Sequence, residues 1–468
     1  MKDVVFREYD IRGTVGESLI LSEVYALGQA IAYYFKQEDP QLKTVVVGMD
    51  GRVHSLPIKD DLCRAFVDSG IEVLFVGVCP TPALYFALHV KDVQAGVMVT
   101  ASHNPKEDNG IKLNLGTHAL YGDKIRAIRD LYKQNKKITS NTKGLIREYV
   151  IVPEYVESLV KEFFVLKDMQ ISFVVDCGNG VAGTVIPLLV EKMGWNQVKQ
   201  LHTVVDGSFP NHQANPVVIK NMQDVKCCLE TSQAQFGVGF DGDADRMAAM
   251  TKEGELLPGD RLLAIFAQPL LQRYPGAAIV FNVVTSNGLI ELLDQLGAIS
   301  CMAPVGHSLI EDAMNTNKAL LGGEISGHFF FKDRHFGYDD AIYAMMRPLE
   351  IMHQSGESLS ELAAAFPKKI SSPEYRIRCK EELKDVVIEH VTKYFRDNPA
   401  CFCITIDGVR AQFSYGWILI RKSNTESVLS VRCESDTKEQ LDSLLQEVAV
   451  LLHEYIESHE LNVLRRVV

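Results

Sequence analysis

The sequence has no excess of positive charge. Its 468 residues contain 48 lysines and arginines against 60 aspartates and glutamates, which gives a formal net charge of -12. Nucleic acids and anionic membrane surfaces attract basic proteins, so this balance argues against either partner. It does not exclude a small anionic ligand, because such a ligand senses only the charges around its own site.

Long apolar runs and cysteine pairs with the C-x-x-C spacing are also missing. No segment reaches the ~18 continuous apolar residues that a membrane-spanning helix needs. The amino-terminal stretch MKDVVFREYD carries acidic residues where a signal peptide requires apolar ones. The ten cysteines include no C-x-x-C pair, the spacing typical of zinc and redox centres. We therefore expect a cytoplasmic protein with reduced thiols.

The length and the patterning indicate several domains. A chain of this size is expected to form three or four. Short β-branched runs such as Thr44–Gly48 alternate with helical patterns such as Leu21–Phe35, which predicts βαβ units and largely parallel sheets. The last part instead predicts antiparallel strands and an amphipathic helix from Lys438. We expect three α/β domains with mixed, largely parallel sheets and a smaller C-terminal α+β domain, at residues 1–150, 151–252, 253–367 and 368–468.

Polar loops follow several of the predicted strands. Apolar runs lead into Thr100–Pro105, into Asp241–Arg246 and into Gly322–His328. Open α/β sheets bind their ligands beside the carboxyl ends of their strands. The serine and histidine at positions 102 and 103 could be simple turn residues, but their place also suits a nucleophile.

The loop DGDADR carries three carboxylates at alternate positions. Asp241, Asp243 and Asp245 can converge on one hard cation, and oxygen ligands suit Mg²⁺ best. A calcium EF-hand is excluded, because Arg246 and Lys252 occupy the positions that require Gly and Glu. A solvated acidic turn is the alternative, and Arg246 would then balance the charge instead of facing a phosphate.

Two further stretches could bind phosphate. Gly178–Gly183 fits G-x-G-x-x-G, but its acidic partner could only be Asp206, so a tight strand-to-helix turn is the favoured interpretation over a dinucleotide site. Arg421–Thr425 offers a guanidinium, two hydroxyls and an amide after a predicted strand. It is either a phosphate cradle or an exposed hairpin turn.

Four other side chains complete the candidate chemistry. Glu324 and Ser326 can accept and donate hydrogen bonds to neighbouring sugar hydroxyls. Lys112 and His307 could carry protons, although most lysines are solvated and many histidines only pack.

In their order along the chain, these motifs resemble the α-D-phosphohexomutase family, and within it the bacterial phosphomannomutase/phosphoglucomutase type. The stretches that carry the resemblance span nearly the whole chain and are Tyr9–Gly13, Thr100–Pro105, Asn109–Lys112, Asp241–Arg246, Gly306–Ser308, Gly323–His328 and Arg421–Thr425. The resemblance implies a heart-shaped, four-domain enzyme with a central cleft. It also identifies Gly178–Gly183 as a structural turn, which removes the nucleotide hypothesis.

The resemblance further implies an isomerase that interconverts hexose 1-phosphate and hexose 6-phosphate, of mannose or glucose, through a hexose 1,6-bisphosphate. Ser102 would be a phosphoserine and would share one Mg²⁺ with Asp241, Asp243 and Asp245. His103 and Arg246 would contact the phosphoserine, and Lys112 and His307 would act as general acid and base. The residues expected to bind substrate are Tyr9, Arg12, Glu324, Ser326, Gly327, His328, Arg421, Lys422, Ser423, Asn424 and Thr425. Sugar phosphates would be its partners, and a monomer is expected.

The chain departs from the family pattern at two places. Asn282–Thr285 stands where many relatives carry a lysine, which makes the sugar preference less secure, and Gln213–Pro216 stands where acidic residues are common. Three alternatives stay open: a phosphoglucosamine mutase, a haloacid-dehalogenase-type phosphatase with Asp241 as nucleophile and Asp243 as acid, and a non-catalytic sugar-phosphate sensor.

Overall fold

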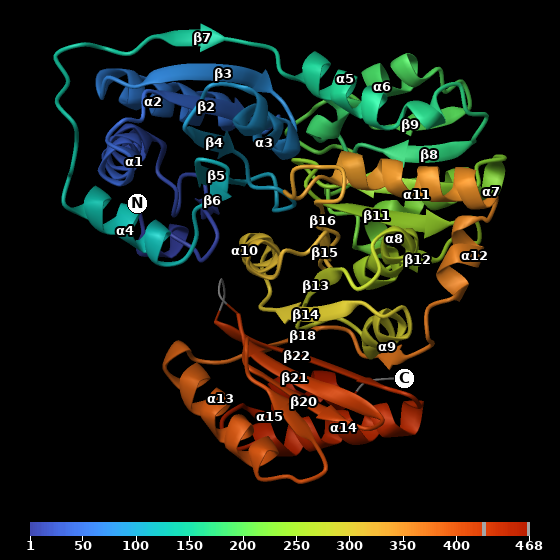
Figure 1. Ribbon diagram of the computed structural model, residues 1–468. Coiled ribbons are helices and arrows are strands. Elements are labelled where there is room, and N and C mark those ends of the chain that lie inside the picture. Colours follow the sequence, from blue (N-terminus) through green and yellow to red (C-terminus); the bar gives the residue numbers. More distant parts are fainter. Residues whose placement is uncertain (424–426, 466–468) are drawn as a thin grey trace. The chain divides into compact units, whose positions relative to one another are not determined.

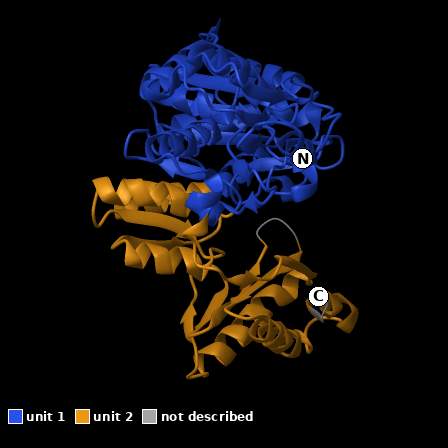
Figure 2. Ribbon diagram, turned by 90° about the vertical axis from the view of Figure 1, so that its right-hand side faces the viewer, with its two compact units in different colours: residues 1–262, 326–363 blue, residues 263–325, 364–468 orange. Residues whose placement is uncertain are grey.

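The chain folds around four β-sheets that follow one another along the sequence, as the computed structural model shows for residues 1–423 and 427–465 (Figure 1). The architecture is that of four domains with mixed α and β structure, as expected, whereas the exact domain boundaries stay predictions. Contacts divide the chain into two compact units (Figure 2). Unit 1 comprises residues 1–262 and 326–363, and unit 2 comprises residues 263–325 and 364–468. None of the helices in the described ranges combines the length and apolar character that a membrane crossing needs.

The first sheet, in unit 1, has the order β1-β5-β4-β2-β3-β7, with β6 paired to β5. Its central strands β4, β2 and β3 are parallel, and β5 is antiparallel to β4 and β1. The strands are β1 (Ile11–Thr14), β2 (Thr44–Met49), β3 (Glu72–Val78), β4 (Ala95–Val99), β5 (Asp108–Leu115), β6 (His118–Ala119) and β7 (Ile146–Glu148). The helices are α1 (Val24–Glu38), α2 (Ser55–Asp68), α3 (Thr81–Val90) and α4 (Asp123–Lys133).

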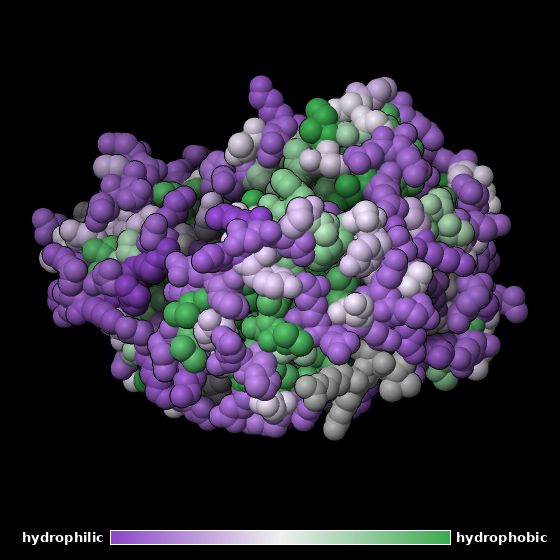
Figure 3. All heavy atoms as spheres, turned by 90° about the horizontal axis from the view of Figure 1, so that it is seen from below, coloured by the Kyte–Doolittle hydropathy of each residue, from purple (hydrophilic) through white to green (hydrophobic). Residues whose placement is uncertain are grey.

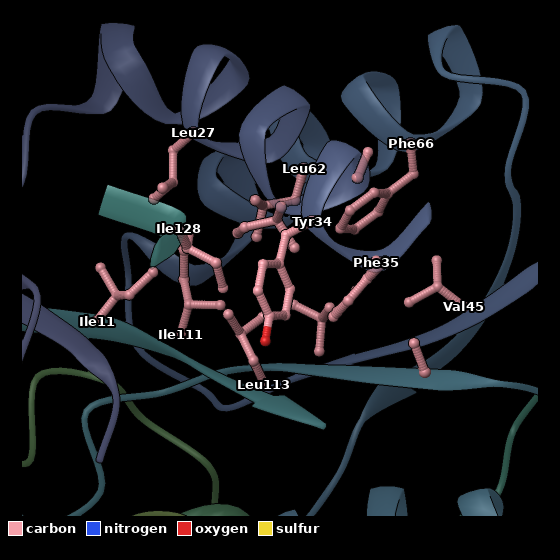
Figure 4. Packing of buried hydrophobic residues seen from close by; sticks show 14 of the residues in the cluster. Ile11, Leu27, Tyr34, Phe35, Val45, Leu62, Phe66, Ile111, Leu113 and Ile128 are labelled. Atoms are coloured by element: carbon pink, nitrogen blue, oxygen red, sulfur yellow. The ribbon is translucent and has the colours of Figure 1, made fainter. Parts of the chain in front are cut away.

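Helical spacing explains the core of this first domain. Leu27, Ile31 and Phe35 recur every four residues on α1, and all three side chains are fully buried. Figure 4 shows Tyr34 of this helix directed toward Leu113 of β5 within the cluster of apolar side chains. The packing of α1 and α2 on the sheet fixes the strands whose ends carry the polar loops.

The second sheet, also in unit 1, has the order β12-β11-β10-β8-β9. Strand β10 pairs in parallel with β8 and antiparallel with β11, so that the Asp241–Arg246 loop connects two neighbouring strands. The strands are β8 (Phe173–Asp176), β9 (Val198–Leu201), β10 (Phe236–Phe240), β11 (Met247–Thr251) and β12 (Leu256–Leu257), and the helices are α5 (Val152–Glu162), α6 (Ile186–Met193) and α7 (Gln223–Thr231).

The next segment contributes to both units. In unit 2, β13 (Ala278–Asn282) pairs in parallel with β14 (Ile299–Ala303) and β15 (Leu321–Gly323). The helices α9 (Asn287–Gln295) and α10 (His307–Asn317) follow the first two of these strands. The remaining elements of this segment are α8 (Gly259–Arg273), β16 (Phe329–Phe331), α11 (Ala341–Ser355) and α12 (Leu359–Ala364).

The fourth sheet, in unit 2, is antiparallel, as the sequence predicts, and has the order β17-β22-β21-β20-β19 with β18 paired to β22. The strands are β17 (Ile370–Ser371), β18 (Tyr375–Arg378), β19 (Phe402–Ile404), β20 (Val409–Phe413), β21 (Gly416–Lys422) and β22 (Val428–Ser435), and the helices are α13 (Glu381–Arg396), α14 (Lys438–Leu452) and α15 (Ser458–Leu461). Apolar side chains of α13 and α14 form one core with the sheet. The face drawn in Figure 3 is mostly hydrophilic, with small groups of hydrophobic residues between.

A buried arginine joins the fourth sheet to the loop after β13 within unit 2. Arg410 donates hydrogen bonds to the carbonyl oxygens of Val283 and Thr285, at 2.7 and 2.8 Å, and its guanidinium lies 4.2 Å from the ring centre of Trp417. Trp417 in turn donates to the buried carboxylate of Glu434 at 3.0 Å. Burial lowers the pKa of Arg410 to about 9. These contacts fix the position of residues 283–287 on this sheet.

Candidate active site

Ser102 lies at the end of a buried strand and directs its hydroxyl at a carboxylate. The chain leaves β4, and Ser102 takes a left-handed backbone conformation with φ 50°. Its backbone N–H donates to the Thr100 hydroxyl at 2.9 Å, which stabilises the turn. The Ser102 hydroxyl donates to Asp241 Oδ2 at 2.6 Å, and its oxygen lies 3.1 Å from His103 Nδ1. The two polar loops that the sequence identifies therefore meet.

A buried arginine that the sequence did not single out holds this loop. Arg52 is 3% exposed and ion-paired with Asp50 at 3.1 Å. Its guanidinium donates to the carbonyl oxygens of Ser102, Asn104, Pro105 and Asp108 at 2.6 to 3.0 Å. The indication of this role in the sequence is the position of Arg52 in a polar loop that follows β2. Four backbone acceptors on one cation fix the loop as a rigid support for the serine.

Arg12, a predicted substrate-binding residue, has the same kind of role. Its guanidinium pairs with Asp10 and donates to the Ala101 carbonyl at 3.2 Å and to the Asn104 side chain at 3.1 Å. The other predicted residue on this segment, Tyr9, is half-buried. Arg12 is thus placed beside the serine loop, where it can support the loop and add positive charge.

Three buried aspartates form the centre of the site. The side chains of Asp241, Asp243 and Asp245 are inaccessible to solvent, and their candidate ligand atoms lie within 4.8 Å of one another. Burial, followed by the charges of Asp245 and Asp243, raises the pKa of Asp241 well above its usual range. Three carboxylates this close repel one another strongly and require a cation.

Lys112 supplies part of that positive charge. This buried lysine of β5 pairs with Asp245 and lies 3.1 Å from Asp243 Oδ2. Burial alone would lower the pKa of Lys112, but the two carboxylates raise it well above its ordinary value. Lys112 is therefore a charged amine, able to donate a proton rather than to accept one.

The donor set fits a hard divalent cation. Asp243 Oδ2 accepts a hydrogen bond from the Thr81 hydroxyl at 2.6 Å, whereas Asp243 Oδ1 is buried and has no hydrogen-bond partner among the described residues. A buried carboxylate oxygen without a partner is costly unless a ligand binds it. Oxygen-only donors are typical of Mg²⁺ sites. The cluster of Asp241, Asp243 and Asp245 is thus a candidate acidic metal site.

His103 and Arg246 flank the serine and the carboxylates. Burial and then the charges of Arg246 and Arg12 lower the pKa of His103, which keeps its imidazole neutral near pH 7. The Arg246 backbone N–H donates to Asp241 Oδ1 at 3.2 Å, and Arg246 Nε is buried without a hydrogen-bond partner in the part of the chain that the structure describes. Gln213, at one of the departures from the family pattern, donates to the His103 carbonyl at 2.8 Å. Both predicted phosphoserine contacts lie beside Ser102.

His328 lies against the carboxylates rather than in an open loop. Its Nδ1 is 2.8 Å from Asp339 and 3.8 Å from Asp245 Oδ1, and its side chain is 2% exposed. The preceding Gly327 has φ 93° and accepts a hydrogen bond from the Met247 N–H at 3.0 Å. A Cβ at Gly327 would lie 2.3 Å from the Met247 oxygen, so glycine is required. Ser326, just before it, is half-buried.

Two predicted residues of unit 2 lie around one turn. The buried Glu324 accepts hydrogen bonds at Oε1 from Asn282 Nδ2 and from the Gly306 N–H, both at 2.9 Å. His307 directly follows Gly306 and begins α10. Both donors engage one oxygen, which orients the carboxylate of Glu324.

Arg421 is connected to the same turn. Its Nε donates to Asp407 Oδ2 at 2.9 Å, and this oxygen also accepts from the Val305 N–H at 3.1 Å. Lys422 pairs with Asp385 on the surface, and the Ser423 N–H donates to the Val428 carbonyl at 3.0 Å. The predicted phosphate-binding residues Asn424 and Thr425 lie outside the described residues.

Comparison with known proteins agrees with this architecture. Four phosphoglucomutase/phosphomannomutase family models match the chain in order: alpha/beta/alpha domain I at residues 3–139, domain II at 153–254, domain III at 258–370 and the C-terminal domain at 374–451. Together these models cover most of the chain.

Individual relatives match over nearly their full length. A phosphomannomutase/phosphoglucomutase of Pseudomonas aeruginosa is 39% identical over 441 residues, 94% of this chain and 93% of the relative. A phosphoglucomutase of Neisseria meningitidis is 38% identical over 441 residues, with coverage of 94% and 95%. A crystal structure of a phosphoglucomutase/phosphomannomutase family protein of Burkholderia thailandensis has a TM-score of 0.89 at 32% identity, with coverage of 97% and 98%. The chain belongs to the phosphoglucomutase/phosphomannomutase family and is an enzyme of the mutase type, an isomerase.

Proposed function

We propose that this mutase interconverts the 1- and 6-phosphates of mannose or glucose through a phosphoserine at Ser102 and a hexose 1,6-bisphosphate. The observation that carries the proposal is the 2.6 Å hydrogen bond from the Ser102 hydroxyl to Asp241, in a cluster of three buried carboxylates. A serine hydroxyl needs electrostatic support both to receive and to release a phosphoryl group. The relatives from Pseudomonas and Neisseria are a phosphomannomutase/phosphoglucomutase and a phosphoglucomutase, which supports mannose and glucose as the sugars.

Ser102, Asp241, Asp243 and Asp245 would hold one Mg²⁺, which supplies Lewis-acid stabilisation of the charge on a transferring phosphoryl group. The buried, unpartnered oxygen of Asp243 supports this assignment. Arg246 and His103 would contact the phosphate on Ser102. Arg246 would supply positive charge, and both residues would form hydrogen bonds that stabilise the phosphate oxygens.

In the first half-reaction, a free sugar hydroxyl would attack the phosphorus of phosphoserine. The new bond joins the sugar oxygen to phosphorus, the bond between phosphorus and Ser102 Oγ breaks, and the hydroxyl proton leaves the sugar. Lys112, a charged amine beside Asp245, would protonate Ser102 Oγ. His307 is then the base, and the second half-reaction reverses both transfers after the bisphosphate turns over.

Recognition of the sugar and of its other phosphate is assigned to residues outside the serine loop. Glu324 and Ser326 would bind sugar hydroxyls, with Gly327 and His328 completing that loop. Arg421, Lys422, Ser423, Asn424 and Thr425 would bind the distal phosphate, and Tyr9 with Arg12 would support the substrate beside the serine loop. Cytoplasmic location and a monomeric state stay predictions.

Mass spectrometry tests this proposal directly. Intact mass and peptide mapping of the purified protein, before and after incubation with glucose 1,6-bisphosphate and Mg²⁺, should find one phosphate on Ser102 that excess hexose monophosphate removes. Ser102→Ala should lose both the phosphate and the activity, while the exposed Ser208→Ala should keep both. Phosphate trapped on Asp241, with activity retained in Ser102→Ala, would instead support the phosphatase. Binding of sugar phosphate without turnover would support the sensor.

A further inference from the structure

A second group of side chains that can ligate a metal lies in the second domain, at residues to which no role is assigned above. Asp176 ends β8 and His202 directly follows β9, and these strands pair in parallel, so that the two side chains emerge at neighbouring strand ends. His212 comes from the long loop that follows. Candidate ligand atoms of Asp176, His202 and His212 lie within 4.8 Å of one another.

The surroundings of His212 orient it as a ligand. Its Nδ1 lies 3.0 Å from the Gln213 carbonyl oxygen and its Nε2 lies 3.0 Å from Asp176 Oδ2. A backbone carbonyl on one ring nitrogen is the usual arrangement that leaves the other nitrogen to a metal. Asp176 Oδ1 accepts from the Gly178 N–H at 2.8 Å, so the carboxylate is also held in place, and Asp176 is 1% exposed.

Asp224 is a fourth possible ligand, beside His202. His202 Nε2 lies 2.8 Å from Asp224 Oδ2, on the first turn of α7. The rings of His202 and His212 have their centres 5.3 Å apart at an interplanar angle of 80°. Each histidine thus faces a carboxylate across the distance of a hydrogen bond, and Asp224 lies next to the group that Asp176, His202 and His212 form.

We propose that Asp176, His202, His212 and Asp224 bind one Zn²⁺. Tetrahedral zinc with ligands at about 2.0–2.1 Å separates those ligands by about 3.3 Å. The two imidazole–carboxylate pairs are at 3.0 and 2.8 Å, close to that separation, and the metal would draw the two pairs together. Two imidazoles favour zinc over magnesium, whose preferred ligands are all oxygen.

The site also has an entry path. His212 and Asp224 line a surface pocket of about 470 Å³, together with Asn211, Gln213, Val218, Lys220, Asn221 and Gln223. Asp224 is 54% exposed, whereas Asp176 forms the buried side. The metal would join β8, β9, α7 and the loop carrying His212, and it would stabilise this domain by binding only the folded chain.

Cobalt is a suitable probe, because four-coordinate Co²⁺ absorbs visible light and zinc displaces it. The full-length protein, stripped with EDTA and transferred to excess Mg²⁺ so that the aspartate loop is saturated, should bind one equivalent of Co²⁺ with strong visible bands that Zn²⁺ abolishes. The variants His202→Asn and His212→Gln should each lose the bands. Asparagine suits position 202 because His202 has φ 49°, a left-handed conformation that asparagine tolerates.

Two controls keep the test decisive. His118→Gln, at an exposed histidine of the first domain, should retain the bands, as should Asp243→Asn in the aspartate loop. Circular dichroism and the metal-free Tm show whether each variant folds, and Zn²⁺ should raise the Tm of the wild type but not of His202→Asn. A wild type that takes up no Co²⁺ in excess Mg²⁺ overturns the proposal. So does uptake that His328→Gln abolishes and His202→Asn does not, because the metal would then lie at Asp245, His328 and Asp339.

Discussion

Asn282 donates its side-chain amide to Glu324 Oε1 at 2.9 Å. The same Glu324 oxygen accepts a hydrogen bond from the Gly306 N–H, also at 2.9 Å. Two neutral donors on one oxygen therefore set the orientation of the carboxylate that is proposed to bind sugar hydroxyls.

We predict that Asn282→Ala raises the KM for hexose phosphate about tenfold while kcat changes less. The loss of one hydrogen bond to a buried charged group, worth about 1.5 kcal/mol, leaves Glu324 less well oriented for ground-state binding. Steady-state kinetics on glucose and mannose 1-phosphates measure this. Asn317→Ala, on the exposed end of α10, is the matched control. An equal fall in kcat with KM unchanged would contradict the positioning role.

The left-handed backbone conformation at position 102 restricts which side chains fit there, in addition to the need for a hydroxyl. Ser102→Thr keeps the hydroxyl but places a β-branched residue at φ 50°, which costs about 1–3 kcal/mol. We expect a lower Tm, displacement of the loop from Asp241 and loss of nearly all phosphorylation by glucose 1,6-bisphosphate. Ser208→Thr, at an exposed serine without positive φ, should be neutral. A phosphothreonine formed at the wild-type rate would disprove this argument.

Mg²⁺ should stabilise the protein through the aspartate cluster. A cation that binds only the folded state adds about 2.7 kcal/mol at a hundredfold excess over its Kd. Addition of Mg²⁺ after EDTA treatment is therefore expected to raise the Tm of the wild type. Asp243→Asn should lose this shift, because the buried Oδ1 is then part of a neutral amide. Asp130→Asn, on the surface of α4, should retain it, and an equal shift in both variants would place the cation elsewhere.

Acid sensitivity should depend on His89. Burial, followed by the charges of His335 and His118, lowers the pKa of His89 to about 4, and its ring stacks on Phe336 at 4.4 Å. Below about pH 6.5 the unfolded chain binds a proton at this histidine while the folded chain does not, so the free energy of unfolding falls as the pH falls from 7.5 to 5. The Tm of His89→Gln should fall less over this range than that of the wild type. His459→Gln, at a side chain 68% exposed, should behave as wild type, and identical acid sensitivity in all three would refute the prediction.

Removal of Arg410 should destabilise unit 2 by about 3 kcal/mol, because two buried carbonyl oxygens lose their donors. Arg410→Lys is not expected to restore the stability, because an ammonium group cannot reproduce the planar guanidinium that lies over the Trp417 ring. Limited proteolysis and thermal unfolding of Arg410→Met, Arg410→Lys and the exposed Arg376→Lys test this. If Arg410→Lys were as stable as the wild type, the proposed role of the guanidinium group would be contradicted.

The sequence predicted the centre of the site because it depends on local pattern. Apolar strands end at Val99, shortly before Ser102, and at Phe240, directly before Asp241, and α/β proteins bind ligands at the carboxyl ends of their strands. Residue type then identified the carboxylates and Lys112, and the structure brings them together.

The remaining contacts depend on long-range packing, which no local pattern reveals. Arg52 reaches its acceptors across 50 to 56 residues of sequence, and nothing near Arg52 indicates that it will be buried. The contact between His328 and Asp245 arises only because Gly327 pairs with Met247. His202 and His212 have no regular metal-binding spacing, and only the pairing of β8 with β9 brings Asp176 to them.

The left-handed backbone at Ser102 also limits how its phosphorylated state can be imitated. Aspartate tolerates this conformation, so Ser102→Asp satisfies the backbone. It would, however, place a fourth carboxylate beside three that are buried and already repel one another, without the oxygens that a phosphate offers to a metal. A phosphomimetic variant is therefore expected to weaken the loop instead of activating the enzyme. On the proposed function, the cation balances the charge of the phosphate as well as that of the three carboxylates, which a carboxylate at position 102 cannot reproduce.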